Sequence, residues 1–137
     1  MGRERAAEMI VVDTSAYVAI FRGEPEADRL SVALGEDPRR VMSAGSYLEA
    51  GILAATRFGG RGKLDGWLRE RRIDITPVDR EQAEIAADAF ERFGKGRHPA
   101  GLNYGDCFAY ALARKLGAPL LFKGDDFART DIQPALM

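Results

Sequence analysis

Acidic side chains stand where apolar segments of the chain begin or end, and their spacing suggests a metal site. Asp13 follows the apolar run MIVV directly, and Asp125 and Asp126 follow the apolar run LLF after two residues. Glu49 and Asp106 fall in the first turns of two expected helices. Carboxylates brought close together repel one another and take up protons unless a cation is present. Mg²⁺ prefers oxygen ligands, and the ion activates bound water and polarises phosphoryl oxygens. The acids therefore suggest phosphodiester cleavage at a magnesium site.

Each acid also has a purely structural explanation. Asp13 in DTS is a suitable helix N-cap. Ser46 and Glu49 match the S-x-x-E capping box, which would fold Glu49 back on its own backbone. Asp106 in a first helical turn complements the helix dipole, an effect worth about 0.3–1 kcal/mol. One of the two aspartates after LLF suits a cap for the turn at DFART. Spacing alone leaves both explanations open, as well as the choice between these two neighbours.

The elements that must position these acids alternate along the chain. Residues 9–12 form a short, wholly apolar run, typical of a strand buried on both faces. Further strands are expected at 39–44, 73–78 and 120–122, and helices at 16–21, 24–34, 46–58, 63–72, 79–93 and 105–116. Strands that alternate with helices predict an α/β fold, a three-layer α/β/α sandwich with a central, mostly parallel sheet of four to five strands. Its carboxyl edge is where ligands bind in such sheets.

Bulk composition is that of one compact domain. The 137 residues are 46% apolar and 30% charged, with a net charge of −1. We expect a single domain over residues 9–137 and a mobile N-terminal extension over residues 1–8. No apolar run approaches the roughly 18 residues that span a bilayer, so no membrane partner is expected. The single cysteine, Cys107, cannot form an internal disulfide, which fits a cytoplasmic location.

Positive charge for a polyanion must come from local patches, because the net charge gives no global field. The glycine-rich loop GKGRHPAGLN is the strongest candidate for RNA binding, through Lys95, Arg97 and His98. Lys123 beside the late acids is another candidate, as are Arg57, Arg61 and Lys63 near a second glycine loop. Solvated loop charges are an equally good explanation for each of them. Asn103 suits either a hydrogen bond near the site or a turn.

Three segments together resemble a known family. MIVVDTSAYVAIFRGEPEA, MSAGSYLEAGILAATRFG and GLNYGDCFAYALARKLGAPLLFKGDDFARTDI are similar, in order and spacing, to PIN-domain ribonucleases of the VapC toxin type. The resemblance covers residues 9 to about 133. VVDTSA alone would be a weak signal, but SYLEAG, NYGDCFAYALA and LLFKGDDFARTDI follow it in register.

The resemblance implies a PIN-like fold and a metal-dependent endoribonuclease. It assigns the catalytic acids to Asp13, Glu49, Asp106 and Asp125. We expect Asp13 and Asp106 to contact Mg²⁺ directly or through one water, with Mn²⁺ able to substitute. The other two acids are expected to complete the shell of the ion or to orient the attacking water. Asp126 belongs to a DF pair that we interpret as mainly structural, with a further part at the site kept open. The small hydroxyl that the family carries beside its first acid matches Thr14 or Ser15.

The resemblance also implies partners: an RNA substrate, a second copy of the chain in a homodimer, and a VapB-like antitoxin with a basic residue on the acidic site. Two alternatives stay open. One is a non-catalytic, RNA-binding PIN-like regulatory module, and the other is a structure-specific DNA nuclease with the same acids. A phosphatase is less favoured, because DTS lacks the D-x-D arrangement of an aspartyl-phosphate enzyme.

Overall fold

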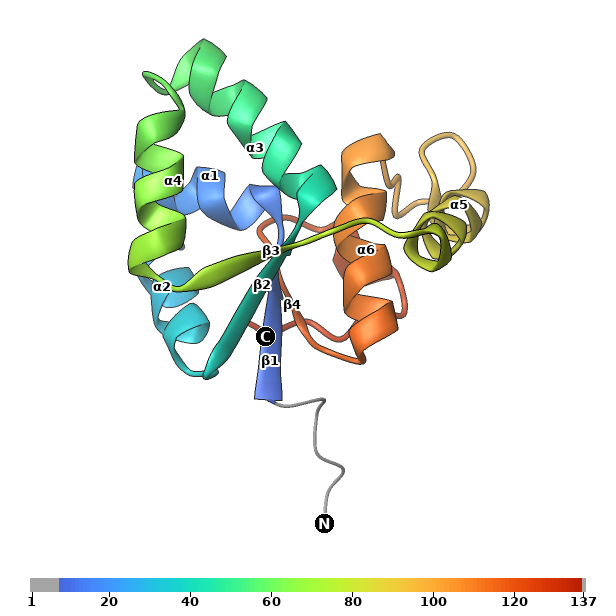
Figure 1. The fold of residues 1–137 in the computed structure, drawn as a ribbon. Helices are drawn as coiled ribbons and strands as arrows, with labels where there is room; N and C mark the ends of the chain where they lie inside the picture. Colours follow the sequence, from blue (N-terminus) through green and yellow to red (C-terminus); the bar gives the residue numbers. More distant parts are fainter. Residues whose placement is uncertain (1–7, 137) are drawn as a thin grey trace.

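A parallel sheet forms the centre of the molecule. The computed structural model describes residues 8–136. Within them the strands are β1 (Met9–Val12), β2 (Arg39–Ser43), β3 (Ile73–Thr76) and β4 (Leu120–Leu121). All pairings are parallel, and the order is β3-β2-β1-β4 (Figure 1). Leu120 also bridges to Pro134 near the end of the described chain. The expected sheet of four to five mostly parallel strands is confirmed.

Helices cover both faces of this sheet (Figure 1). One face packs against α1 (Thr14–Arg22), α2 (Ala27–Gly35), α3 (Ala44–Arg57) and α4 (Arg61–Glu70). The other packs against α5 (Arg80–Phe93), α6 (Tyr104–Leu116) and the short 3₁₀ helix η2 (Phe127–Arg129). The three-layer α/β/α sandwich is therefore present as predicted, and each side of the sheet has its own apolar cluster.

The side chains of β1 alternate between these two clusters. Met9 and Val11 join the α5–α6 side, whereas Ile10 and Val12 join the α1–α4 side. All four are at most 6% exposed. This explains the unbroken apolar run MIVV, because a central parallel strand has no face in water. It also fixes the place of Asp13, which leaves the sheet at its carboxyl edge.

Four helices begin two or three residues away from their expected starts, and two of them, α1 and α4, each begin two residues early, at Thr14 and Arg61. The helix expected from Glu24 begins at Ala27, after a turn that contains Pro25. The helix expected from Ser46 begins at Ala44, because the side chain of Ser43 caps it and accepts from the Gly45 backbone N–H at 3.1 Å. Ser46 thus lies inside α3, and the Ser46–Glu49 capping box that the sequence allowed is not formed.

Apart from Glu8, the predicted extension at residues 1–8 lies outside the described residues. Across residues 8–136, none of the helices combines the length and apolar character needed to cross a membrane.

Candidate active site

Asp13 caps the N-terminus of α1 and keeps one oxygen unused. Its Oδ2 accepts a hydrogen bond from the Ser15 backbone N–H at 2.9 Å. Its other oxygen, Oδ1, is buried and has no hydrogen-bond partner among the described residues. The residue is only 2% exposed. An unsatisfied buried carboxylate oxygen costs free energy unless a ligand meets it. The capping explanation is thus correct but incomplete.

Asp106, at the start of α6, also uses one carboxylate oxygen in a helix cap and leaves the other unused. The Asn103 side chain accepts from the Asp106 N–H at 2.9 Å, and Asp106 Oδ2 accepts from the Asn103 N–H at 3.0 Å. This reciprocal pair is a capping box. Asn103 therefore has the turn role that the sequence allowed. Within the described chain, the second carboxylate oxygen of Asp106 makes no hydrogen bond and is free to bind a ligand.

Two glycines bring Glu49 close to the start of α6. A Cβ on Gly105 would lie 2.6 Å from Oε2 of Glu49, and a Cβ on Gly45 would lie 2.3 Å from the Phe108 ring. Neither glycine has a positive φ, so their need for small size comes from packing alone. The N-terminal halves of α3 and α6 can approach only because these side chains are missing. The Glu49 carboxylate consequently lies over the first turn that carries Asp106.

The electrostatics of the acids confirm their proximity. Burial, and then the charges of Asp106 and Glu49, raise the pKa of Asp13 from 3.8 to about 7, although the bonds from Ser15 oppose the rise. Burial, followed by the charges of Asp126 and Glu49, raises the pKa of Asp106 to about 6, against the bond from Asn103. Four acids from distant segments therefore share one electrostatic site, where a cation would be strongly favoured.

The two aspartates after β4, Asp125 and Asp126, differ in their relation to this site. Asp126, directly before η2, lies close enough to raise the pKa of Asp106. Its side chain makes no capping hydrogen bond to η2, so the structural role suggested for it at the turn is absent. Both Asp125 and Asp126 are exposed. The sequence favoured Asp125 as the fourth acid, whereas the structure brings the charge of Asp126 to Asp106.

A cavity of about 320 Å³ opens over these groups. Seven of the residues singled out from the sequence line it: Asp13, Thr14, Ser15, Glu49, Asn103, Asp106 and Lys123. Glu24 also lines it, and sequence reasoning missed this residue. Glu24 stands between two helices in GEPEA, and nothing but its acidity marked it. Asp125 and Asp126 lie outside the cavity wall.

The two hydroxyls beside Asp13 connect neighbouring elements. Thr14 Oγ1 donates to the Ser46 carbonyl at 3.0 Å, which ties α1 to α3. Ser15 Oγ accepts from the Lys123 backbone N–H at 3.0 Å, which ties α1 to the loop after β4. Both hydroxyls therefore fix the walls of the cavity.

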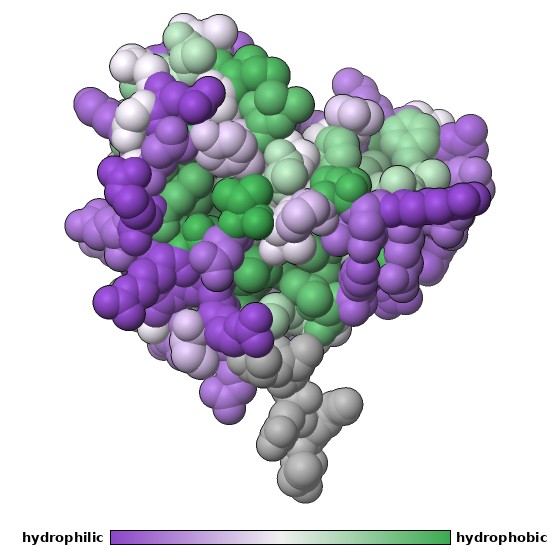
Figure 2. All heavy atoms as spheres, viewed as in Figure 1, coloured by the Kyte–Doolittle hydropathy of each residue, from purple (hydrophilic) through white to green (hydrophobic). Residues whose placement is uncertain are grey.

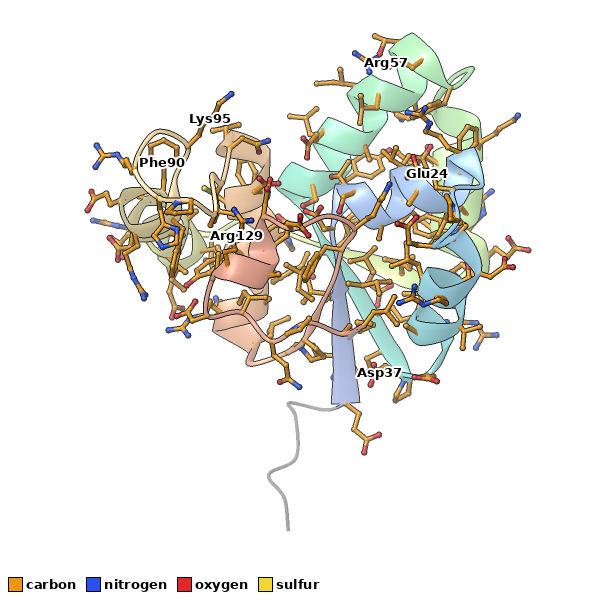
Figure 3. The ribbon with its side chains drawn as sticks, turned by 180° about the vertical axis from the view of Figure 1, so that it is seen from behind. Glu24, Asp37, Arg57, Phe90, Lys95 and Arg129 are labelled. Atoms are coloured by element: carbon orange, nitrogen blue, oxygen red, sulfur yellow. The ribbon has the colours of Figure 1, made fainter. Side chains whose placement is uncertain are left out.

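The glycine-rich loop lies apart from the acid cavity. His98 accepts from the Ala100 N–H through Nδ1 at 2.9 Å and packs edge-on against Phe93, at 5.0 Å between ring centroids. Lys95 and Arg97 are exposed, and Figure 3 shows Lys95 projecting outward, far from Glu24. None of the three lines the cavity. His98 stabilises its own loop, and the Arg97 guanidinium lies 5.9 Å from the centre of the Phe90 ring.

The second group of basic candidates is also peripheral. Arg57 projects from the far end of α3 (Figure 3). Arg61 pairs with Asp65 at 3.5 Å, and Lys63 lies 5.7 Å from the centre of the Phe21 ring. None of the three lines the acid cavity.

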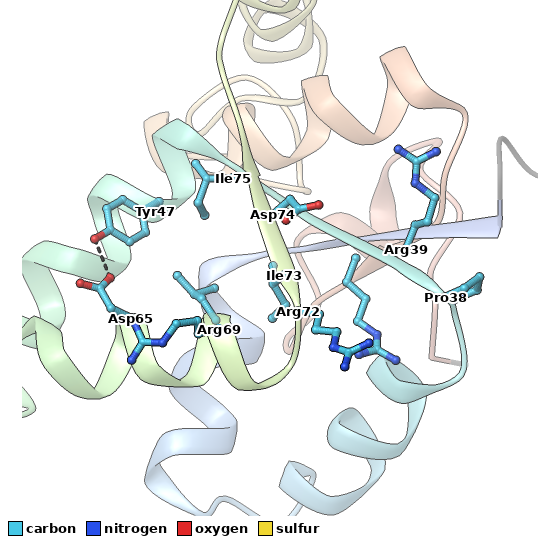
Figure 4. Close-up of a pocket in the computed structure, with 11 residues that line it drawn as sticks. Pro38, Arg39, Tyr47, Asp65, Arg69, Arg72, Ile73, Asp74 and Ile75 are labelled. Carbon is cyan, nitrogen blue, oxygen red and sulfur yellow. Dashed lines mark hydrogen bonds between the residues drawn. The ribbon is translucent and has the colours of Figure 1, made fainter.

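A larger cavity, of about 690 Å³, runs beside β3 at the open edge of the sheet (Figure 4). Exposed arginines line it, including Arg39, Arg69 and Arg72. Its one internal hydrogen bond drawn in Figure 4 joins the Tyr47 hydroxyl to Asp65 at 2.7 Å. Among the described residues it holds no buried, unsatisfied carboxylate. Size alone would select this cavity, but its carboxylates are already satisfied, because Asp65 is hydrogen-bonded and Asp74 is exposed to water.

The acid cavity fits a hard divalent cation with few protein ligands. Within residues 8–136, no three His, Cys, Asp or Glu side chains lie close enough together to hold an ion by themselves. Asp13 and Asp106 each keep one free carboxylate oxygen. Mg²⁺ commonly takes only one or two carboxylates and completes its octahedron with water. The donor set, all oxygen and all acidic, suits that ion.

Comparison with known proteins identifies the family. The model of the PIN domain family matches residues 10–133. Ribonuclease VapC of Mycolicibacterium smegmatis is 53% identical over 125 residues, covering 90% of this chain and 97% of the relative. Ribonuclease VapC30 of Mycobacterium tuberculosis is 50% identical, with 90% and 95% covered. The chain belongs to the VapC family of PIN domains.

Solved structures of other VapC proteins share the fold. VapC20 of Mycobacterium tuberculosis, described as a toxin that cleaves the sarcin–ricin loop, superposes with a TM-score of 0.71 at 21% identity, covering 90% of this chain and 95% of that one. VapBC-1 of nontypeable Haemophilus influenzae gives a TM-score of 0.65 at 23% identity, with 91% and 95% covered. For this VapC-family chain, the PIN fold expected from the sequence is confirmed.

Proposed function

We propose that this VapC-family chain is a Mg²⁺-dependent endoribonuclease that acts as the toxin of a toxin–antitoxin pair. The observation that carries the proposal is the buried, unpartnered Oδ1 of Asp13, which shares a solvent-open cavity with Asp106. Membership of the VapC ribonuclease family supports the reaction class. Such an oxygen is stable only when a cation or a proton meets it.

The free oxygens of Asp13 and Asp106 would hold the ion, and Mn²⁺ would substitute for Mg²⁺. When bound, the ion activates water and polarises the phosphoryl oxygens of RNA. The protein supplies orientation. Ser15 and Asn103 lock the two carboxylates by backbone hydrogen bonds, so each presents its second oxygen to the cavity.

The remaining acids would direct the attacking water. Glu49 is placed over the first turn of α6 by Gly105, within reach of the same space as Asp106. We assign Asp125 the fourth role that the sequence suggested, and we add Asp126, whose charge acts on Asp106. Attack on phosphorus would leave a 5′-phosphate and a 3′-hydroxyl.

A cleavage assay on purified protein tests the proposal. With Mg²⁺ or Mn²⁺, the wild type should cut at least one of tRNA, rRNA or mRNA, and EDTA should stop it. Asp13→Asn and Asp106→Asn should lose cleavage while unfolding at temperatures no lower than the wild type. Intact RNA of all three kinds over a wide range of protein concentrations would refute it.

Two other functions give different results in the same assay. A non-catalytic RNA-binding module would bind RNA equally well after removal of the acids. A DNA nuclease would cut flap DNA in preference to structured RNA. The buried, unpartnered oxygen of Asp13 favours a cation-dependent reaction over simple binding, because a buried carboxylate takes up a proton unless a cation is near.

A VapB-like antitoxin is the proposed protein partner. Solved relatives of this fold include a toxin–antitoxin complex from Klebsiella pneumoniae and VapBC2 of Rickettsia felis bound to promoter DNA. A basic side chain placed in the acid cavity would neutralise Asp13 and Asp106, and inhibition would follow. Added antitoxin should protect RNA, and its effect should weaken when that basic residue is removed. A pair of this kind would act in the cytoplasm, where its RNA lies.

Homodimerisation is proposed through exposed apolar side chains on α3 and the start of α6. Leu48, Ile52 and Tyr104 are 63%, 55% and 79% exposed. Figure 2 shows hydrophobic surface along α3 and between α3 and α6. Large exposed apolar groups gathered on one side commonly mark an interface. Light scattering should give a dimer for the wild type and a monomer for Leu48→Glu/Ile52→Glu; a monomeric wild type would refute it.

A further inference from the structure

Lys123 is the one cation among the described residues that line the acid cavity. It follows β4, and its backbone N–H donates to Ser15 Oγ at 3.0 Å. Its side chain is 38% exposed and lines the cavity together with the acids. Its ammonium group is therefore the one cation, among the described residues, that the cavity wall offers to an RNA phosphate.

Glu24 holds the ammonium group in that place. The Lys123 Nζ donates a hydrogen bond to Glu24 Oε1, whereas Glu26 Oε1 lies 3.9 Å away. Glu24 comes from the link between α1 and α2, and the pair joins segments 99 residues apart. Arg22 supports the carboxylate from the other side, with Nε at 3.6 Å. Figure 3 labels Glu24 beside α1.

The alternative position for this ammonium group is among the acids. Asp13, Glu49 and Asp106 line the same cavity and offer a strongly negative environment. Without the Glu24 carboxylate, Lys123 would be drawn inward and would neutralise them. It would then compete with the metal and would no longer be available to the phosphate.

We propose that Glu24 is a positioning residue, which holds Lys123 on the cavity wall as a contact for an RNA phosphate and keeps it away from the metal-binding acids. This inference rests on the ribonuclease activity proposed above. Glu24 acts only through Lys123 and touches neither the metal nor the reacting atoms.

Equilibrium RNA binding by the metal-free protein tests the inference without catalysis. Lys123→Gln should weaken binding and reduce the magnitude of the log–log salt slope by about 0.7, the value for one phosphate contact on a single strand. Glu24→Gln should do the same. Removal of a negative charge would by itself strengthen RNA binding, so weaker binding points to the loss of Lys123 from its position. Tighter binding, or an unchanged salt slope, would overturn the inference.

A second measurement tests how Glu24 affects the Mg²⁺ requirement of cleavage. Glu24→Gln should raise the Mg²⁺ concentration needed for half-maximal cleavage several-fold, because the released Lys123 competes for the acids. Glu24→Gln/Lys123→Gln should return this requirement to the wild-type value and bind RNA no more weakly than Lys123→Gln alone. Additive losses in the double variant would contradict action through Lys123.

A charge swap separates positioning from a simple clamp. Glu24→Lys/Lys123→Glu keeps an ion pair between the same segments but moves the cation off the β4 loop. If the pair only clamps the two segments, this variant should recover RNA binding, and the inference fails. Glu26→Gln removes a neighbouring negative charge without the hydrogen bond that Glu24 makes, so this matched control should bind RNA at least as tightly as the wild type. A wild type that cuts no RNA would overturn the proposed function itself, whereas normal cleavage with an unaltered Glu24→Gln would overturn only the role of Glu24.

Discussion

The acid cavity and the groove beside β3 differ in how their charged groups are satisfied. The groove is about twice as large, at about 690 Å³ against 320 Å³, and Arg39, Arg69 and Arg72 on its wall are exposed to water. Its carboxylate Asp65 already bonds to Tyr47 and Arg61. In the smaller cavity, Asp13 is buried, one of its oxygens is unpartnered, and its neighbours are like charges.

This contrast teaches that unsatisfied buried charge identifies the reactive site better than volume does. Folding does not leave a carboxylate unpaired in the interior without cost, since the charge loses its hydration. A protein retains such a costly carboxylate where the binding of a ligand offsets the cost. The groove contains no carboxylate with a comparable cost, so substitutions there should lower only the stability of the protein, and only slightly.

The largest expected effect is that of Asp13→Asn on cleavage. The change removes the charge and the free oxygen that face the cavity, so the rate should fall at least about 100-fold. Cleavage of RNA under single-turnover conditions measures it. Asp74→Asn in the β3 groove removes an exposed charge of the same kind and should leave the rate unchanged. Equal losses in the two variants would erase the distinction between the cavities.

The pH dependence of stability should also differ between substitutions in the acid cavity and substitutions in the β3 groove. The pKa of Asp13 is about 7 in the folded chain, above its ordinary value of 3.8. Between these values the folded chain keeps a proton that the unfolded chain has released. The stabilisation from this group is thus complete below about pH 4 and is lost as the pH rises through 7. Thermal unfolding of metal-free protein should show this decline, and Asp13→Asn should flatten it. Asp74→Asn should follow the wild-type curve.

Gly105→Ala should damage the site while sparing the fold. The new Cβ would meet the Glu49 carboxylate, which is the far end of a flexible side chain and can move away. Alanine also favours the helix by up to about 1 kcal/mol. We expect cleavage to fall about tenfold, with the melting temperature unchanged or higher. Gly66→Ala in α4, where no atom lies closer than 4.0 Å, is the matched control and should keep full activity. Activity retained in Gly105→Ala would mean that the placement of Glu49 is not needed.

Tyr47→Phe in the groove should give the smallest effect. The change removes the hydrogen bond to Asp65 and should cost about 1 kcal/mol of unfolding free energy. Chemical denaturation measures the cost, and cleavage should stay at the wild-type rate. A loss of cleavage without a loss of stability would give the groove a part in the reaction.

Local sequence was enough to predict most of the fold. MIVV predicted a central strand because its residues are apolar on both faces, and the helix expected at 79–93 agrees with α5 to within one residue. The starts of α2 and α3 were less accurate, since a turn at Pro25 and the side chain of Ser43 decide them. Caps compete over one or two residues, and periodicity alone does not choose among them.

The sequence by itself determined which residues supply charge and at which ends of strands and helices they stand. Asp13, Glu49 and Asp106 were identified in this way, because short apolar strands and helix starts are local patterns. Tertiary structure alone decided what each acid faces. Among residues 8–136 it left Oδ1 of Asp13 without a partner, brought the charge of Asp126 to Asp106, and placed Glu24 on the cavity wall. Those outcomes depend on how closely α3, α6 and the loops approach, which is a property of packing between distant segments that no local pattern encodes.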